Sequence, residues 1–170
     1  MKAIVDAFAA DGIVFAPPTE YVPDLLVGPG RLTPRGPSST QLKDITFGWQ
    51  IAKQMGGLDI GQTVCIKDRV VLAVEALEGT DACIRRAGTV CSTGGFSVVK
   101  VAKPQQDMRF DVPTVGLGTL ESMASAGAIV LAIEAARTVV LDESQFLQYA
   151  CHRKIAIVAE LHDGSIQAAA

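Results

Sequence analysis

The chain contains 170 residues, of which 15 are Lys or Arg and 18 are Asp or Glu, so its formal net charge is −3. Hydrophobic residues make up 49% and charged residues 19%, a composition that predicts a folded domain with a real core and excludes an intrinsically disordered chain. The near-neutral charge balance and the 5% aromatic content disfavour nucleic-acid binding, because phosphate backbones select clustered Lys and Arg.

Four widely spaced cysteines, Cys65, Cys83, Cys91 and Cys151, form no CxxC pair. They therefore predict free thiols in a reducing compartment rather than a zinc site. The N-terminus lacks the apolar run of a signal peptide, and the longest apolar run near the middle of the chain is too short to span a bilayer. We expect a soluble, cytoplasmic protein.

Six of the eight prolines fall within residues 17–37, together with three glycines. Proline removes backbone donors and glycine adds backbone entropy, so this segment is expected to be a connector or an extended wrapping segment. Ahead of it, residues 1–10 predict a helix and residues 13–15 a short strand. The expected division of the chain is a remnant of an N-terminal domain with its linker over 1–37, one domain over 38–162, and a polar, Ala-rich tail over 163–170.

From Ser38 onward, helical and strand periodicities alternate. Ser38, Ser39 or Thr40 can cap a helix that ends at Gly56-Gly57. The later expected elements are strands over 63–67 and 69–76 joined as a hairpin, a helix over 80–90, a strand over 96–101, an irregular segment over 103–118, a helix over 119–126, a strand pair around 129–133 and 138–141, a helix over 143–153 and a strand over 155–161. This order predicts an α/β fold, a single domain with a mixed β-sheet and flanking helices behind a Pro/Gly-rich linker.

The most polar stretch beside a buried strand begins at Lys100, and loops at strand ends are where α/β folds bind ligands. If this stretch is extended, Asp107, Arg109 and Asp111 point the same way, with the two carboxylates roughly 13 Å apart. That spacing is too wide to hold one ion, although a coiled loop could bring them together. Such residues suit a magnesium-bridged phosphate, and the alternative is a solvated loop whose charges pair with one another.

A second candidate site is the run Glu75-Ala-Leu-Glu78-Gly79-Thr80-Asp81, at the end of a strand and the start of a helix. A glycine turn followed by exposed helix amides can hold a phosphate oxygen, and Glu75 and Glu78 can contribute to a metal site or position water. The alternative is a plain helix cap, with Thr80 as the N-cap and Asp81 complementing the helix dipole.

Three weaker signals carry no chemistry on their own. The run Gly116-Leu-Gly118-Thr119 opens a helix but lacks the remainder of a Walker or dinucleotide pattern. Glu134 is either a buried carboxylate or the edge of its strand, and the pattern favours the edge. Cys151 and His152 are helix neighbours that project in different directions, so adjacency does not make them a nucleophile–base pair.

Two of these runs resemble motifs of the LpxI-type UDP-2,3-diacylglucosamine pyrophosphatases, namely Val71–Asp81 with the following Arg85-Arg86-Ala87, and Lys100–Gly116. The runs Leu58–Gln62 and Asp44-Ile45 fit the same pattern. Members of this family have two domains. The resemblance therefore implies that this chain is the C-terminal domain and that an N-terminal domain is missing.

The resemblance also implies a reaction and a place in the cell. The enzyme would use Mg²⁺ and water to split UDP-2,3-diacylglucosamine into UMP and 2,3-diacylglucosamine 1-phosphate (lipid X) in lipid A biosynthesis, at the cytoplasmic face of the inner membrane. The implied residues are Asp111, Asp81 and Glu78 for catalysis, Asp111, Asp81 and Asp107 for the metal, and Lys100, Lys103, Gln106, Arg109 and Thr80 for substrate binding.

In this family the lipid substrate is thought to sit between the two domains, so the chain alone is expected to hydrolyse its substrate poorly or not at all. The alternatives are non-catalytic: a module that binds a nucleotide-sugar or a phosphate, or a domain that forms homo-oligomers. Contact with the membrane surface is expected to be transient, because no strongly amphipathic basic helix of the interfacial kind is present.

Overall fold

The protein is described from a computed structural model, in which residues 2–161 are placed. Its centre is a six-stranded sheet with the order β1-β8-β6-β4-β2-β3. The strands are β1 (Gly30–Arg31), β2 (Thr63–Lys67), β3 (Val70–Val74), β4 (Phe96–Lys100), β6 (Ala128–Glu134) and β8 (Ala156–Glu160). Strands β4, β6 and β8 are parallel, whereas β1, β2 and β3 pair antiparallel to their neighbours. The mixed α/β fold is thus confirmed, and the expected tail over 163–170 lies outside the described residues.

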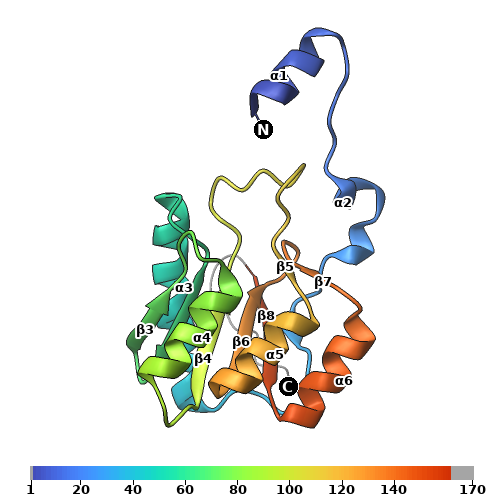
Figure 1. The fold of residues 1–170 in the computed structure, drawn as a ribbon. Helices are drawn as coiled ribbons and strands as arrows, with labels where there is room; N and C mark the ends of the chain where they lie inside the picture. Colours follow the sequence, from blue (N-terminus) through green and yellow to red (C-terminus); the bar gives the residue numbers. More distant parts are fainter. Residues whose placement is uncertain (1, 162–170) are drawn as a thin grey trace.

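Helices cover both faces of this sheet (Figure 1). The long helix α3 (Ser39–Gly57) packs on one face, and α4 (Thr80–Val90), α5 (Leu117–Ala126) and α6 (Glu143–Arg153) pack on the other. Alternate strand residues face opposite helical layers, so the sheet separates two apolar clusters. The α3 side includes Ile45, Trp49, Val64, Val99, Val130 and Val158, and the other side includes Cys65, Ile84, Phe96, Leu131, Phe146 and Ile157.

The start of α3 and its contact with the sheet follow from two local features. Ser38 and Gln41 form a reciprocal capping box, in which the Ser38 side chain accepts from the Gln41 amide and the Gln41 side chain accepts from the Ser38 amide. At Gly48 an added Cβ would lie 2.1 Å from Cδ1 of Ile66 and 2.9 Å from Cγ2 of Val99. The helix can therefore approach β2 and β4 closely only because residue 48 has no side chain.

One predicted strand pairing is wrong. The segment 138–141 contains β7 (Val139–Val140), but β7 pairs in parallel with β5 (Thr114–Val115) rather than with β6. After Glu134 the chain turns through Ala136, at a φ of 57°, and Thr138 accepts a hydrogen bond from Val27. This turn carries β7 beyond the edge of the main sheet, where the segment predicted to be irregular supplies β5.

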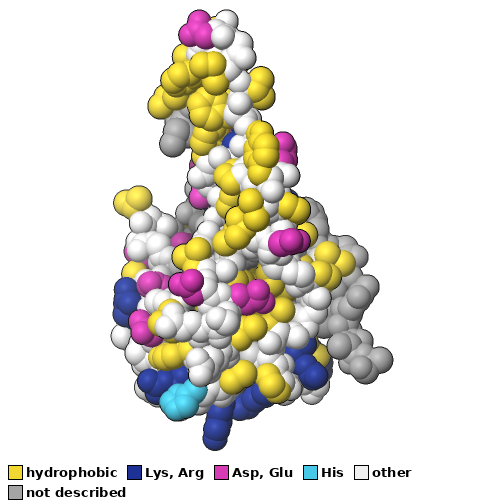
Figure 2. Space-filling model, turned by 90° about the vertical axis from the view of Figure 1, so that its right-hand side faces the viewer, with side chains coloured by type: hydrophobic (Ala, Val, Ile, Leu, Met, Phe, Trp, Pro, Cys, Tyr) yellow, Lys and Arg dark blue, Asp and Glu magenta, His cyan; other side chains and the backbone are white. Residues whose placement is uncertain are grey.

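The N-terminal arm, residues 2–26, extends from the sheet as helix α1 (Lys2–Ala10), the single turn α2 (Pro18–Tyr21) and the 3₁₀ turn η1 (Pro23–Leu25) (Figure 1). The strand expected over 13–15 does not form, because no strand lies beside it; instead the Phe15 ring packs against Phe8 and Phe110. Figure 2 shows apolar side chains gathered on this arm and acidic side chains across the middle of the same face.

Several chain ends meet at one edge of the sheet. The parallel strands β4, β6 and β8 end there, and because β2 is antiparallel to β4, β2 begins there and β3 ends there. We call this the site edge; the segment 101–113, which crosses it between β4 and β5, is the edge loop. No helix within residues 2–161 is long and apolar enough to cross a membrane.

Candidate active site

A buried carboxylate organises the turn between β3 and α4. Glu75 is 7% exposed, and its Oε1 accepts a hydrogen bond of 3.0 Å from the Thr80 hydroxyl at the start of α4. Its other oxygen accepts from the Gln62 amide at 3.4 Å, and an added Cβ at Gly61 would lie 2.1 Å from the Glu75 carbonyl oxygen. The turn to the helix is made by Gly79, which has a φ of 82° and is the N-cap. The alternative of a cap by Thr80 is therefore wrong: Thr80 is the first helical residue, and its hydroxyl binds Glu75.

Lys100, the last residue of β4, is a buried cation at the site edge. It is 7% exposed, and its Nζ donates a hydrogen bond of 2.8 Å to the carbonyl oxygen of Thr114. Burial lowers the pKa of Lys100, and the negative charges of Glu75, Asp81 and Asp111 oppose that shift. The structure thus brings three acids from three segments near enough to this ammonium group for their charges to act on its pKa.

Asp81 lies where two helices begin. It is in the first turn of α4, and an added Cβ at Gly118, in the first turn of α5, would lie 4.0 Å from its Oδ2. The run from Gly116 does open a helix, as predicted, with Gly116 as the N-cap. Within residues 2–161 the Asp81 carboxylate has no hydrogen-bond or ion-pair partner, so its oxygens are available to a ligand at the site edge.

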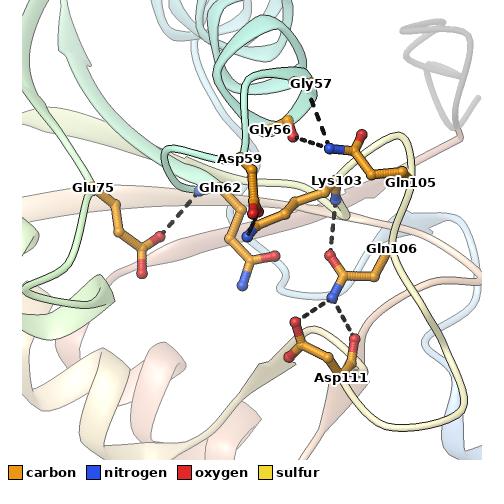
Figure 3. A network of polar contacts seen from close by, with 9 residues as sticks. All are labelled: Gly56, Gly57, Asp59, Gln62, Glu75, Lys103, Gln105, Gln106 and Asp111. Atoms are coloured by element: carbon orange, nitrogen blue, oxygen red, sulfur yellow. Dashed lines mark hydrogen bonds and ion pairs between the residues drawn. The ribbon is translucent and has the colours of Figure 1, made fainter. Parts of the chain in front are cut away.

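The edge loop is coiled, and Figure 3 shows Gln106 turned towards Asp111 within it. Residues 107–110 form a turn rather than an extended run, and Arg109 binds both oxygens of Asp107 at 2.8 and 2.7 Å. The Asp107 carboxylate is therefore occupied by Arg109 rather than shared with Asp111. Gln106 donates to the Asp111 carboxylate at 2.6 Å and accepts from the Lys103 amide at 3.1 Å. The bonding to Arg109 lowers the pKa of Asp107.

The structure also locates Glu78, which was predicted to be a site residue, and Asp59, which was overlooked. Glu78 is exposed and forms an ion pair with Arg86, which lowers the pKa of Glu78, so it lies on the outer side of the turn. The Lys103 ammonium pairs with Asp59, a residue that sequence reasoning missed. Asp59 has a φ of 57° in the connection between α3 and β2, and only its place in the run Leu58–Gln62 offered a signal.

The expectation that Glu134 sits at a strand edge is wrong. Glu134 ends the central strand β6, is fully buried, and binds Lys53 of α3 through both oxygens, at 2.8 and 2.7 Å. Lys53 was also overlooked, although it lies one helical turn after Trp49 on the apolar face of α3, where an unpaired charge would be costly.

The carboxylates at the site edge are compatible with a magnesium ion only if a phosphate helps to complete its coordination shell. Within residues 2–161 no set of three His, Cys, Asp or Glu side chains is arranged to hold a metal. Mg²⁺ commonly takes only one or two carboxylates and completes its shell with water and substrate phosphates. Asp81 and Asp111 are the two candidates, because the charge of each acts on the pKa of Lys100 and, among residues 2–161, each has at least one carboxylate oxygen without a hydrogen-bond partner.

The described fold and site define an α/β domain with a charged, phosphate-compatible edge. Residues 28–158 match the family described as the LpxI C-terminal domain, and the chain belongs to this family. Over 149 residues it is 33% identical to a protein of Caulobacter vibrioides named UDP-2,3-diacylglucosamine pyrophosphatase LpxI. The match covers 84% of this chain and 53% of that relative, so the chain spans about half the length of the curated relative it matches.

Proposed function

We propose that this chain is the phosphate-handling half of a Mg²⁺-dependent hydrolase that splits UDP-2,3-diacylglucosamine into UMP and 2,3-diacylglucosamine 1-phosphate. The substrate and reaction class come from the relative's name and the family. The observation that carries the proposal is the buried Lys100 ammonium at the site edge, near enough to Asp81 and Asp111 for their charges to act on it. A buried cation beside two available carboxylates suits a diphosphate and its counter-ion.

Hydrolysis of a diphosphate requires charge neutralisation, in-line positioning and an activated water. Lys100 and the first amides of α4 would bind the non-bridging phosphate oxygens, because a helix N-terminus and an ammonium both attract anions. Asp111 would orient the attacking water and accept its proton. Mg²⁺, held by Asp81 and Asp111, would supply the remaining neutralisation of phosphate charge.

The edge loop would exchange partners when substrate binds. Arg109 and Lys103 are proposed to leave Asp107 and Asp59 for the phosphates, since a doubly charged diphosphate is a stronger partner than an exposed carboxylate. Gln106 would leave Asp111 for the sugar or the uridine. Asp107 would then become a further metal contact once Arg109 leaves, and Glu78 would act through water at the turn before Thr80.

A domain equivalent to the other half of the Caulobacter relative is the proposed partner. That domain would close the cleft around the sugar and the acyl chains, and the complete enzyme would act in the cytoplasm with transient contact to the inner membrane. A non-catalytic module that binds a nucleotide-sugar is the second candidate, because this chain spans only about half of its relative. An oligomerisation domain is the third.

The test is UMP release from UDP-2,3-diacylglucosamine, measured with Mg²⁺ and with EDTA, for the chain alone and after addition of the N-terminal half of the Caulobacter relative. Mg²⁺-dependent release in the completed mixture is the expected result. No release in either mixture, with calorimetric binding of UDP and Mg²⁺ retained, would favour the binding module. If neither UMP release nor binding of UDP and Mg²⁺ is detected, the result would favour the oligomerisation domain.

A further inference from the structure

The peptide group of Ala102 is held by a buried ion pair at the point where the edge loop leaves β4. Ala102 is fully buried, and its amide donates to Oε2 of Glu134 at 2.7 Å. Its carbonyl oxygen accepts from Nζ of Lys53 at 2.9 Å. Both backbone polar groups of one residue are therefore bound by two side chains that bind each other at 2.7 and 2.8 Å.

The backbone groups of Ala102 form no hydrogen bonds with a neighbouring strand among residues 2–161. The ladder between β4 and β6 ends at Lys100, and the next amide, that of Val101, donates to the carbonyl oxygen of Gln62. Farther along the edge loop, the amides of Gln106, Phe110 and Asp111 bond within the loop. Because a buried peptide group needs partners, the ion pair determines where the loop begins.

The chemistry of the pair points to a role other than stability. Glu134 is fully buried and the Lys53 side chain is 16% exposed, so both charges have lost most of their water. Burial lowers the pKa of Lys53, and the hydrogen bond and charge of Glu134 oppose that shift. Apolar residues of similar volume often stabilise a protein as well as a buried pair does, whereas a charged pair offers fixed, directional hydrogen bonds to the backbone.

We propose that Lys53 and Glu134 are positioning residues, which place Asp111 and the phosphate-binding side chains of the edge loop by fixing the Ala102 peptide. The inference rests on the proposed function for what the loop does, and on the bonds of Ala102 for how it is held. Neither residue reaches the substrate. Their effect is transmitted through the nine residues from Lys103 to Asp111, which carry every group of the loop assigned to phosphate, metal or water.

The test compares the wild type with a double variant, Lys53→Met with Glu134→Gln, which leaves no unpaired charge behind. Ile45→Val is the matched control, because Ile45 is fully buried on the same face of the sheet but makes no hydrogen bond to Ala102. Hydrogen exchange is followed at the amides of Gln106, Phe110 and Asp111 and at those of β6. Turnover is measured on the chain completed with the N-terminal half of the Caulobacter relative.

In the double variant, exchange of the three loop amides is expected to rise at least about tenfold relative to β6, and kcat to fall at least about tenfold with KM within about threefold, a change of ~1.4 kcal/mol in the barrier. Lys53→Arg, which keeps the charge, is expected to recover part of both. Ile45→Val should change neither the exchange of the loop amides relative to β6 nor kcat. Unchanged loop exchange overturns the proposal, and so does faster exchange with an unchanged kcat. The exchange measurement needs no turnover, so an inactive wild type would count against the proposed function and leave the positioning of the loop to be judged by exchange.

Discussion

Nζ of Lys100 donates a hydrogen bond of 2.8 Å to the carbonyl oxygen of Thr114, which joins the end of β4 to the far end of the edge loop. The near end is fixed at Ala102, so the loop that carries Asp111 is tied at both of its ends. Lys100 therefore has two functions in our account: its ammonium binds the loop backbone and presents a positive charge at the site edge.

Replacing Lys100 with Met is expected to lower UMP release at least about 100-fold, because a cation that stabilises phosphate charge in a dry site contributes about 2.7 kcal/mol or more. Lys100→Arg should retain more activity than Lys100→Met, since the positive charge stays. Steady-state turnover of the completed enzyme measures both variants, with circular dichroism to verify folding. A folded Lys100→Met variant with turnover close to wild type would remove Lys100 from the active site.

The hydrogen bond from Thr80 to Glu75 is expected to make a measurable contribution to the free energy of unfolding. Thr80→Val keeps the shape of the side chain and leaves a buried carboxylate without its hydroxyl donor, so we expect a loss of about 1.5–3 kcal/mol in the free energy of unfolding. Thr89→Val is the control in the same helix, because the Thr89 hydroxyl is exposed and bonds only to the carbonyl oxygen of Arg86; its effect should stay within about 0.5 kcal/mol. Urea denaturation measures both, and equal losses would contradict the role of Glu75 in the turn.

Gly61 and Gly57 form a second matched pair. A Cβ at Gly61 would lie 2.1 Å from the backbone oxygen of Glu75, so Gly61→Ala should push apart the two segments that form the turn and cost about 1–3 kcal/mol. At Gly57, the last residue of α3, nothing lies within 4 Å of an added Cβ. Gly57→Ala should therefore be neutral or stabilise the protein by up to about 1 kcal/mol. Thermal or urea unfolding of the two variants in the opposite order would refute this packing of the turn.

Glu160, at the end of β8, makes the stability depend on pH. It is 3% exposed, neither of its carboxylate oxygens has a hydrogen-bond partner among the described residues, and burial raises its pKa from the ordinary 4.5 to about 7. Between these two values the folded protein holds a proton that the unfolded chain has released. The free energy of unfolding should therefore fall as the pH rises through this window, by about 3 kcal/mol in total, and level off above it.

Glu160→Gln removes the carboxyl group whose protonation makes the free energy of unfolding depend on pH. The variant is expected to be more stable than the wild type at pH 8, with the advantage shrinking towards pH 5. Urea midpoints at several pH values between 4.5 and 8.5 give the two curves. Parallel curves would mean that Glu160 ionises normally in the folded protein.

Much of the fold was predictable, because it follows from local chemistry. The helix ends at Ser38 and Gly57, the hairpin of β2 and β3, and helix α6 are all specified by caps, glycines or strand periodicity close in sequence. The pairing of β7 was not predictable in this way, because its partner β5 is 25 residues away in register and only two residues long. Short strands carry too little periodicity to reveal a distant partner.

The candidate site was also predictable only where it depends on residues close together in the sequence. Sequence reasoning selected the two runs that meet at the site edge, since both combine an apolar strand with polar residues at its end. It placed Glu134 wrongly and missed Lys53 and Asp59, because each of these residues pairs with a residue 44 to 81 positions away in the sequence. An acid at the end of an apolar strand looks the same in sequence whether it meets water or a buried lysine.

The most direct test of the account is turnover by Asp111→Asn beside Asp68→Asn, both in the chain completed with an N-terminal domain. Asp68 lies at the tip of the β2–β3 hairpin, away from the site edge, at a φ of 51° that Asn also tolerates. We predict that Asp111→Asn lowers Mg²⁺-dependent UMP release at least about 100-fold while Asp68→Asn leaves it unchanged. If a folded Asp111→Asn variant keeps turnover within about tenfold of wild type, a loss of only ~1.4 kcal/mol, the central assignment is wrong.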